Sequence, residues 1–148
     1  MTLLEISEIL EQIKDIPGFD MGAAGAASVE RLRRAYNGCG PERWPESIRD
    51  KLDDLTRMFA PSVLVHDFEF DCSDGSEEKM HDANERLHRN NKAIVSHYYP
   101  LFTWRMLRPS YRLQRTKAVA LMVALNTFTC DALTAQAWKE ASKDGEDC

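Results

Sequence analysis

Residues 61–70 read PSVLVHDFEF, and the conformation of this stretch decides the fold class. Its β-branched and aromatic residues are compatible with a short strand. A lone strand has no partner to pair with, however, and the segments on either side of it have a helical period. We therefore predict a helix that begins at Pro61 and Ser62, within an all-α fold.

The neighbouring segments repeat apolar residues at steps of three and four. An amphipathic helix is expected at the start of the chain and ends near Pro17 and Gly18. Its apolar positions are Leu3, Leu4, Ile6, Ile9, Leu10 and Ile13. Further helices are expected over residues 29–35 after an N-cap at Ser28, over residues 46–59, from Ser76, and over residues 111–140.

Composition places these helices in one compact domain. The chain has 148 residues, of which 43% are hydrophobic and 29% charged, as in ordinary globular proteins. Residues 1–148 are expected to form a single multi-helix domain, with a frayed acidic tail from about Ser142. The net charge of −5 gives no general attraction to nucleic acid. The longest apolar run, residues 118–125, falls short of the roughly 20 residues that a transmembrane helix needs.

Four cysteines lie far apart in the chain, at Cys39, Cys72, Cys130 and Cys148. Their spacing matches neither a metal site nor a disulfide-dense secreted scaffold. The N-terminus has early acidic residues and no basic segment before an apolar run, so it does not resemble a secretory signal. We therefore expect unpaired thiols and a cytoplasmic setting.

Two motifs have the composition of a catalytic site. The loop Tyr36-Asn37-Gly38-Cys39-Gly40 carries two glycines, which allow backbone carbonyls to turn inward. Convergent carbonyl oxygens together with a carboxylate suit calcium. The pair His66-Asp67 follows on the predicted helix, where adjacent side chains point about 100° apart. His66 is placed to act as a general base while Asp67 faces a metal ion.

These motifs resemble the calcium loop and catalytic helix of phospholipase A2, above all its disulfide-free viral and prophage-borne members. Residues 36–40 match the Y-x-G-x-G loop, and residues 65–70 are similar to the H-D-x-x-Y motif. Ala83-Asn84-Glu85-Arg86-Leu87 is similar to the family's A-D-x-R-F. The resemblance covers about residues 36–90. It implies a calcium-dependent hydrolase of phospholipids or other esters. Its catalytic residues would be His66, Asp67 and Asn84, and its calcium ligands Tyr36, Gly38, Gly40 and Asp67.

The chain departs from the family pattern at two of these positions. Phe70 replaces a tyrosine, and Asn84 stands where the family has an aspartate. Asparagine accepts a hydrogen bond from an imidazole, but it has no charge with which to stabilise an imidazolium. These departures imply a slow enzyme, an altered chemistry, or a scaffold that has lost catalysis.

Two alternatives to a hydrolase of this kind remain. One is a non-catalytic binding or structural protein on the same scaffold, such as a component of a phage particle. It would contact other particle proteins and reside in the particle or in the cytoplasm of a bacterial host. The weaker one is an all-α metal-dependent phosphohydrolase, because His81-Asp82 repeats the His-Asp pair of residues 66–67.

A basic stripe follows the aromatic segment near residue 100. Its members recur at helical steps beside Trp104 and Tyr111, with Pro109 interrupting them; they are Arg105, Arg108, Arg112 and Arg115, followed by Lys117. They could contact the phosphates of lipids or nucleic acids, or form a solvated face that pairs with the chain's 24 acidic residues.

Overall fold

The computed structural model describes residues 1–37, 45–129, 135, 136, 138, 139 and 141. Within these residues every regular element is a helix, which confirms the all-α prediction. The α-helices are α1 (Leu3–Lys14), α2 (Val29–Ala35), α3 (Glu46–Thr56), α4 (Ala60–Asp71), α5 (Glu77–Tyr98) and α6 (Pro109–Thr129). Short 3-10 helices are η1 (Gly22–Ala26), η2 (Arg57–Phe59) and η3 (Trp104–Leu107).

Local capping chemistry explains where the helices begin. The side chains of Thr2, Ser28 and Ser76 accept hydrogen bonds from the third backbone N–H of α1, α2 and α5, respectively. Pro61 lies in the first turn of α4, where a missing backbone N–H costs nothing. The stretch that could have formed a strand is therefore the helix α4, as predicted.

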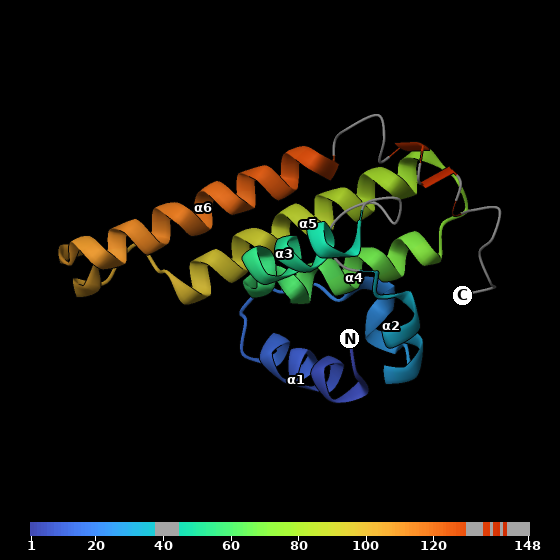
Figure 1. Ribbon diagram of the computed structural model, residues 1–148, viewed down its shortest axis with the longest axis horizontal. Coiled ribbons are helices and arrows are strands. Elements are labelled where there is room, and N and C mark those ends of the chain that lie inside the picture. The colour runs from blue at the N-terminus through green and yellow to red at the C-terminus, as the bar shows by residue number, and fades with distance from the viewer. Residues whose placement is uncertain (38–44, 130–134, 137, 140, 142–148) are drawn as a thin grey trace.

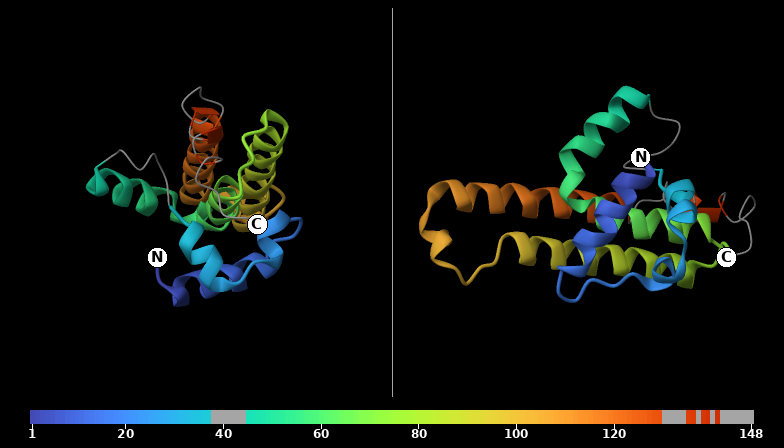
Figure 2. Two further views of the ribbon diagram at one scale, coloured as in Figure 1. Left: turned by 90° about the vertical axis from the view of Figure 1, so that its right-hand side faces the viewer. Right: turned by 90° about the horizontal axis from the view of Figure 1, so that it is seen from below.

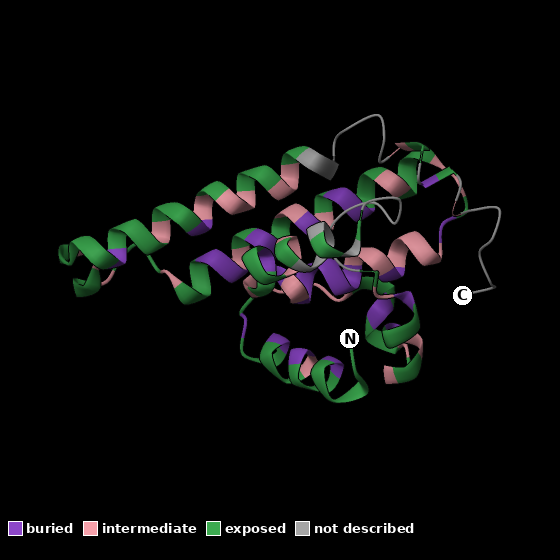
Figure 3. Cartoon of the chain, viewed as in Figure 1, coloured by how far each residue is buried: buried purple, intermediate pink, exposed green. Residues whose placement is uncertain are grey.

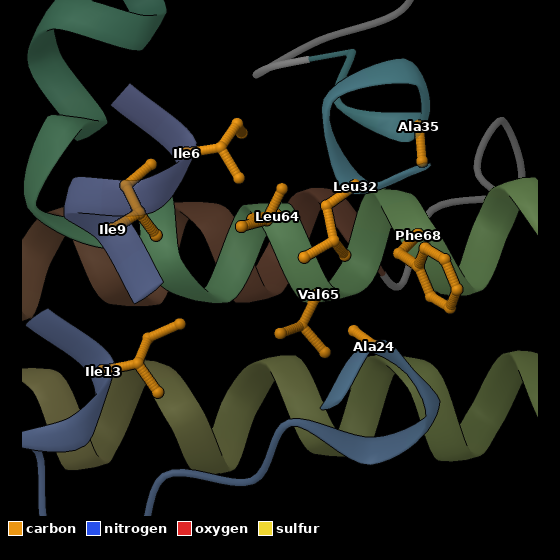
Figure 4. Close-up of a cluster of buried hydrophobic side chains, with 9 residues drawn as sticks. All are labelled: Ile6, Ile9, Ile13, Ala24, Leu32, Ala35, Leu64, Val65 and Phe68. Carbon is orange, nitrogen blue, oxygen red and sulfur yellow. The ribbon is translucent and has the colours of Figure 1, made fainter. Parts of the chain in front are cut away.

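Three successive helices, α4, α5 and α6, run back and forth beside one another, while α1 and α2 cover the opposite side of α4 (Figures 1 and 2). A first hydrophobic cluster joins α1, η1, α2 and α4 through the nine side chains drawn in Figure 4. A second cluster lies between η2, α5 and α6 and contains Ile16, Phe59, Ile94, Val95 and Ala118. The helix α4 is thus enclosed on both sides.

A single last helix was expected over residues 111–140. The helix α6 covers Pro109–Thr129, and the described residues 135, 136, 138, 139 and 141 are helical as well. The acidic tail expected from Ser142 lies outside the described residues. Among the helices that the structure describes, none combines the length and the apolar character needed to cross a membrane.

The prediction of four unpaired thiols is wrong, because Cys72 is disulfide-bonded. The other three cysteines lie outside the described residues. Cys72 follows the end of α4 and packs partly buried against the first hydrophobic cluster. Pairing depends on which cysteines the fold brings together, and their sequence spacing carried no sign of it. The cytoplasmic expectation rested in part on reduced thiols, and the bridge removes that part of its basis.

The central helix α5 carries two fully buried asparagines. Asn91 Nδ2 donates to Asn126 Oδ1 of α6 at 2.9 Å, while Asn91 Oδ1 accepts from the hydroxyl of Ser62 on α4. Asn90 Nδ2 donates to the carbonyl of Asp20 at 2.8 Å, and Asn90 Oδ1 accepts from the N–H of Asp20 at 2.9 Å. These two carboxamides connect α5 to both flanking helices and to the segment that precedes η1.

Replacing Asn91 by alanine should destabilise the fold because Ser62 and Asn126 lose their buried partner. We expect the free energy of unfolding to fall by about 1–3 kcal/mol, measured by urea denaturation followed by circular dichroism. Gln114→Ala is the matched control, since it removes an exposed carboxamide from α6. Equal unfolding midpoints for the two variants would contradict the bridging role of Asn91.

The disulfide gives a second prediction. Alkylation of the native protein without reduction should leave Cys72 unmodified, whereas reduction before alkylation should label it. Peptide mapping by mass spectrometry distinguishes the two states and identifies the partner cysteine. An alkylated Cys72 in the unreduced protein would contradict the bridge.

Candidate functional site

His66 and Asp67 lie in the second half of α4 and face different neighbours. His66 Nε2 lies 3.0 Å from Oδ1 of Asn84 on α5. Asp67 Oδ2 accepts the backbone N–H of Asn37, just after α2, at 2.8 Å. This divergence follows from the 100° step between adjacent residues of a helix. The structure therefore brings three of the expected site residues to one part of α4 and its surroundings.

The contact with Asn84 determines which nitrogen of His66 carries the proton. A carboxamide oxygen only accepts hydrogen bonds, so Nε2 of His66 is the protonated nitrogen and donates to it. The lone pair of the neutral ring is then on Nδ1. Burial lowers the pKa of His66 to about 4, the hydrogen bond with Asn84 raises it in part, and the nearby His88 lowers it further. The imidazole is neutral at pH 7.

One aromatic ring packs on the imidazole, and a second packs on the first. The ring of Phe70 lies one turn further along α4, with its centroid 4.6 Å from that of His66. Trp138 meets Phe70 edge to face at 4.8 Å. Its indole N–H donates to the carbonyl of Ser76 at 2.9 Å, and its own carbonyl accepts from the hydroxyl of Ser73. Trp138 thus covers the turn between α4 and α5 next to Phe70.

The expected calcium ligands are described only in part. Gly38 and Gly40 lie outside the described residues, whereas Tyr36 and Asp67 lie within them. The hydrogen bond from Asn37 places the first residues of the glycine loop beside the Asp67 carboxylate. A carboxylate next to a loop that can supply carbonyl oxygens fits the preference of calcium for hard oxygen ligands. The donor chemistry of this corner is therefore suitable for that ion.

A group of charged residues supports the site from the far side of α5. Arg86 forms ion pairs with Glu69 of α4 and with Asp20, whose Oδ2 lies 3.0 Å from Nε. The guanidinium lies against Gly22, where an added Cβ would come within 2.8 Å of the Arg86 Cζ. Gly22 also has a positive φ of 49°. Arg86 thus ties together α5, α4 and the start of η1.

The second His-Asp pair does not join the first. His81 and Asp82 are exposed on α5. Within the described residues, no group of three or more histidine, cysteine, aspartate or glutamate side chains is arranged to hold a metal ion.

Sequence analysis missed two parts of this site. Trp138 is buried, and no local pattern in the sequence indicated its position over Phe70. A lone tryptophan in an otherwise polar C-terminal segment was the available signal. The pairing of Arg86 with Glu69 was not foreseen either, since it joins two partly buried side chains on different helices.

The lowered pKa of His66 makes stability depend on pH. Between the unfolded value of 6.5 and about 4, the unfolded chain binds a proton that the folded protein excludes. The contribution of His66 is therefore fully present above about pH 6.5 and is lost as the pH falls toward 4. We expect a decrease of up to about 3 kcal/mol in the free energy of unfolding. Urea denaturation at a series of pH values measures it.

His66→Gln should remove this part of the pH dependence, because glutamine does not titrate. His81→Gln is the matched control at an exposed histidine and should keep it. If the free energy of unfolding depends on pH in the same way for the wild type and for His66→Gln, His66 is not the residue responsible for this pH dependence.

Comparison with known proteins adds no relative to this description. No family model, curated protein or solved structure matches the chain.

Proposed function

We propose that the protein is a calcium-dependent, phospholipase A2-like hydrolase of phospholipid esters. His66 would be its general base, Asn84 the residue that orients His66, and Asp67 a calcium ligand. The proposal uses residues on α4, α5 and the segment after α2, which meet at one corner of the fold.

The observation that carries the proposal is the 3.0 Å contact between His66 Nε2 and Asn84 Oδ1. The two residues are 18 positions apart and belong to the two helical motifs that resemble the family. A histidine whose Nε2 is held by a fixed acceptor presents Nδ1 in a defined direction. General-base catalysis requires this kind of orientation.

The reaction would begin with a water molecule hydrogen-bonded to Nδ1 of His66. As the water oxygen adds to the ester carbonyl carbon, its proton moves to Nδ1. The imidazolium then returns the proton to the leaving alkoxide as the carbon–oxygen bond breaks, which restores the neutral ring. Phe70, itself packed against Trp138, covers one side of the imidazole and lowers the polarity of its surroundings.

A calcium ion, when bound, would polarise the ester carbonyl and stabilise the charge that develops on its oxygen. Asp67 and the carbonyl oxygens of Tyr36, Gly38 and Gly40 would hold it. The hydrogen bond from the Asn37 N–H to Oδ2 of Asp67 supports this assignment, since it joins the loop to the carboxylate.

Asn84 makes the proposed enzyme slow. The imidazolium formed during attack is a buried cation, and a neutral carboxamide offsets little of its desolvation. The same burial that keeps the pKa of His66 near 4 makes proton uptake from water unfavourable. Low turnover is therefore expected even in the presence of calcium.

A non-catalytic protein on this scaffold, such as a component of a phage particle, is the second candidate. Two observations favour it: the neutral partner of His66, and the cover that Phe70 and Trp138 provide. The bridge at Cys72 suits an environment outside the reducing cytoplasm, such as a released particle.

The hydrolase proposal predicts calcium-dependent release of fatty acid from mixed phospholipid vesicles. His66→Gln should abolish release yet leave calcium binding nearly unchanged, and Asp67→Asn should abolish both. Asn84→Asp should raise the rate by up to about tenfold for each unit by which the carboxylate raises the His66 pKa, because a more basic imidazole removes the proton of the attacking water more readily. Calorimetric titration measures calcium binding, and NMR titration of the imidazole measures the pKa.

Asp82→Asn is the matched control, since it neutralises an exposed carboxylate on α5. It should leave the rate of release, calcium binding and the His66 pKa unchanged. If the wild type releases no fatty acid with calcium, and Asn84→Asp raises the His66 pKa without restoring release, the non-catalytic candidate replaces the hydrolase.

A further inference from the structure

The connection between α5 and α6 gathers exposed apolar side chains. We call residues 98–108, which include η3, the hairpin tip. Of the large apolar residues that are exposed in the described part of the chain, five of eleven lie in this short segment. Their exposed fractions are 42% for Tyr98, 53% for Leu101, 101% for Phe102, 63% for Trp104 and 83% for Leu107. Such a concentration differs from the scattered single apolar residues of ordinary surfaces.

The hairpin tip projects away from the rest of the molecule. In Figures 1 and 2, α5 and α6 extend together beyond the other helices, and the tip lies at their far end. Figure 3 shows that most residues there are exposed. A flat surface could approach the tip without meeting α1, α2 or α3.

Specific contacts hold the hairpin tip in a defined conformation. The hydroxyl of Tyr111 donates to the carbonyl of Pro100 at 3.0 Å, and Arg115 Nε donates to the carbonyl of Tyr99. The rings of Tyr99 and Tyr111 are 5.8 Å apart between centroids. Thr103 caps η3 through its hydroxyl. The hairpin tip is therefore a turn that is already folded when its apolar side chains face solvent. Binding to a partner would not require the entropy cost of ordering this segment.

The charge around the hairpin tip is positive, although the protein as a whole is acidic. No aspartate or glutamate occurs from residue 86 to residue 130, while the whole chain has a net charge of −5. Arg105, Arg108, Arg112 and Lys117 are exposed in or just after the tip. Within the described residues, no acidic side chain forms an ion pair with any of these four.

One arginine is combined directly with an aromatic ring. The guanidinium of Arg108 lies over the ring of Trp104, with its carbon 4.5 Å from the ring centroid. Tryptophan is preferred at the boundary between lipid headgroups and hydrocarbon, and an arginine beside it reaches the phosphate layer. Phe102 and Leu107 supply the apolar side chains that would enter the hydrocarbon.

We propose that the hairpin tip is an anchor that binds the surface of anionic phospholipid bilayers. The positive charge of the hairpin tip favours an anionic bilayer over a second copy of the chain as its binding partner. A second copy of the chain would bring two cationic tips together and repel, whereas an anionic bilayer offers both negative phosphates and an apolar interior. The proposal does not rest on the proposed hydrolase. Asn84 precedes Tyr98 by 14 residues of α5, or about 21 Å along the helix at 1.5 Å per residue.

Flotation of the full chain with vesicles tests the anchor, in the presence of a chelator so that calcium-dependent hydrolysis plays no part. The vesicles contain phosphatidylcholine alone or phosphatidylcholine mixed with phosphatidylglycerol. The wild type should float with the mixed vesicles and bind phosphatidylcholine at least about tenfold more weakly. Binding should weaken with salt because the Debye length shortens.

Two variants of the hairpin tip separate its two contributions. Phe102→Ser combined with Leu107→Ser removes apolar insertion, and Arg105→Glu combined with Arg112→Glu removes attraction to phosphate. Each should reduce binding to mixed vesicles by about tenfold or more. All four side chains are exposed, so the fold should remain intact, which circular dichroism verifies.

Matched controls place the same changes elsewhere. Leu4→Ser with Leu55→Ser alters side chains that are 70% and 61% exposed on α1 and α3. Arg33→Glu with Lys51→Glu reverses two exposed charges on α2 and α3. Both controls should bind as the wild type does, and so should His66→Gln, whether or not the protein proves to be a hydrolase.

Three results would overturn the anchor. The first is a wild type that does not float with mixed vesicles, and the second is a pair of tip variants that bind as well as the controls. The third is a dimer in analytical ultracentrifugation that dissociates in the Phe102→Ser, Leu107→Ser variant, because a second copy would then cover the hairpin tip.

Discussion

The helix α5 is the element on which the other helices depend, because its buried face carries amides as well as apolar residues. Asn84, Asn90 and Asn91 each contact a different neighbour: His66 of α4, the backbone of Asp20, and the pair Ser62 and Asn126. Apolar side chains allow a helix to slide or rotate with small losses, whereas a buried amide tolerates little displacement before its partner is left unpaired. These contacts therefore fix how α4, α6 and the N-terminal part sit around α5.

The same constraint determines the chemistry available at His66. The ring is half-buried and pairs with a neutral acceptor, so both partners are uncharged and neither leaves an uncompensated charge away from solvent. An aspartate at position 84 would be a stronger partner during catalysis, but it would bury a negative charge in the resting protein. Asn84 thus favours the stability of the fold, while it leaves the His66 imidazole less basic than an aspartate would. Such conflicts between stability and activity are common in proteins.

The two ends of α5 have different physical characters. In its first half, α5 lies beside a half-buried imidazole that packs on Phe70, and Arg86 forms ion pairs with Glu69 and Asp20. Beyond its end, the hairpin tip leaves apolar side chains and arginines in solvent, with no acid in the sequence nearby to pair with them. The first arrangement pairs its charged groups within the protein, whereas the exposed arginines and apolar side chains of the hairpin tip would find their partner in an anionic membrane.

By itself, the sequence determined the all-α class and most helix starts, because periodicity and capping act over three or four residues. Ser28 and Ser76 are N-caps as expected, and residues 61–70 are helical. It also indicated Asn84 as the neighbour of His66, through the resemblance of two helical motifs. Only the tertiary structure decided that Trp138 covers Phe70, that Cys72 is bridged and that Arg86 closes against Gly22. These contacts join residues far apart in the chain, and local patterns do not encode which distant surfaces will meet.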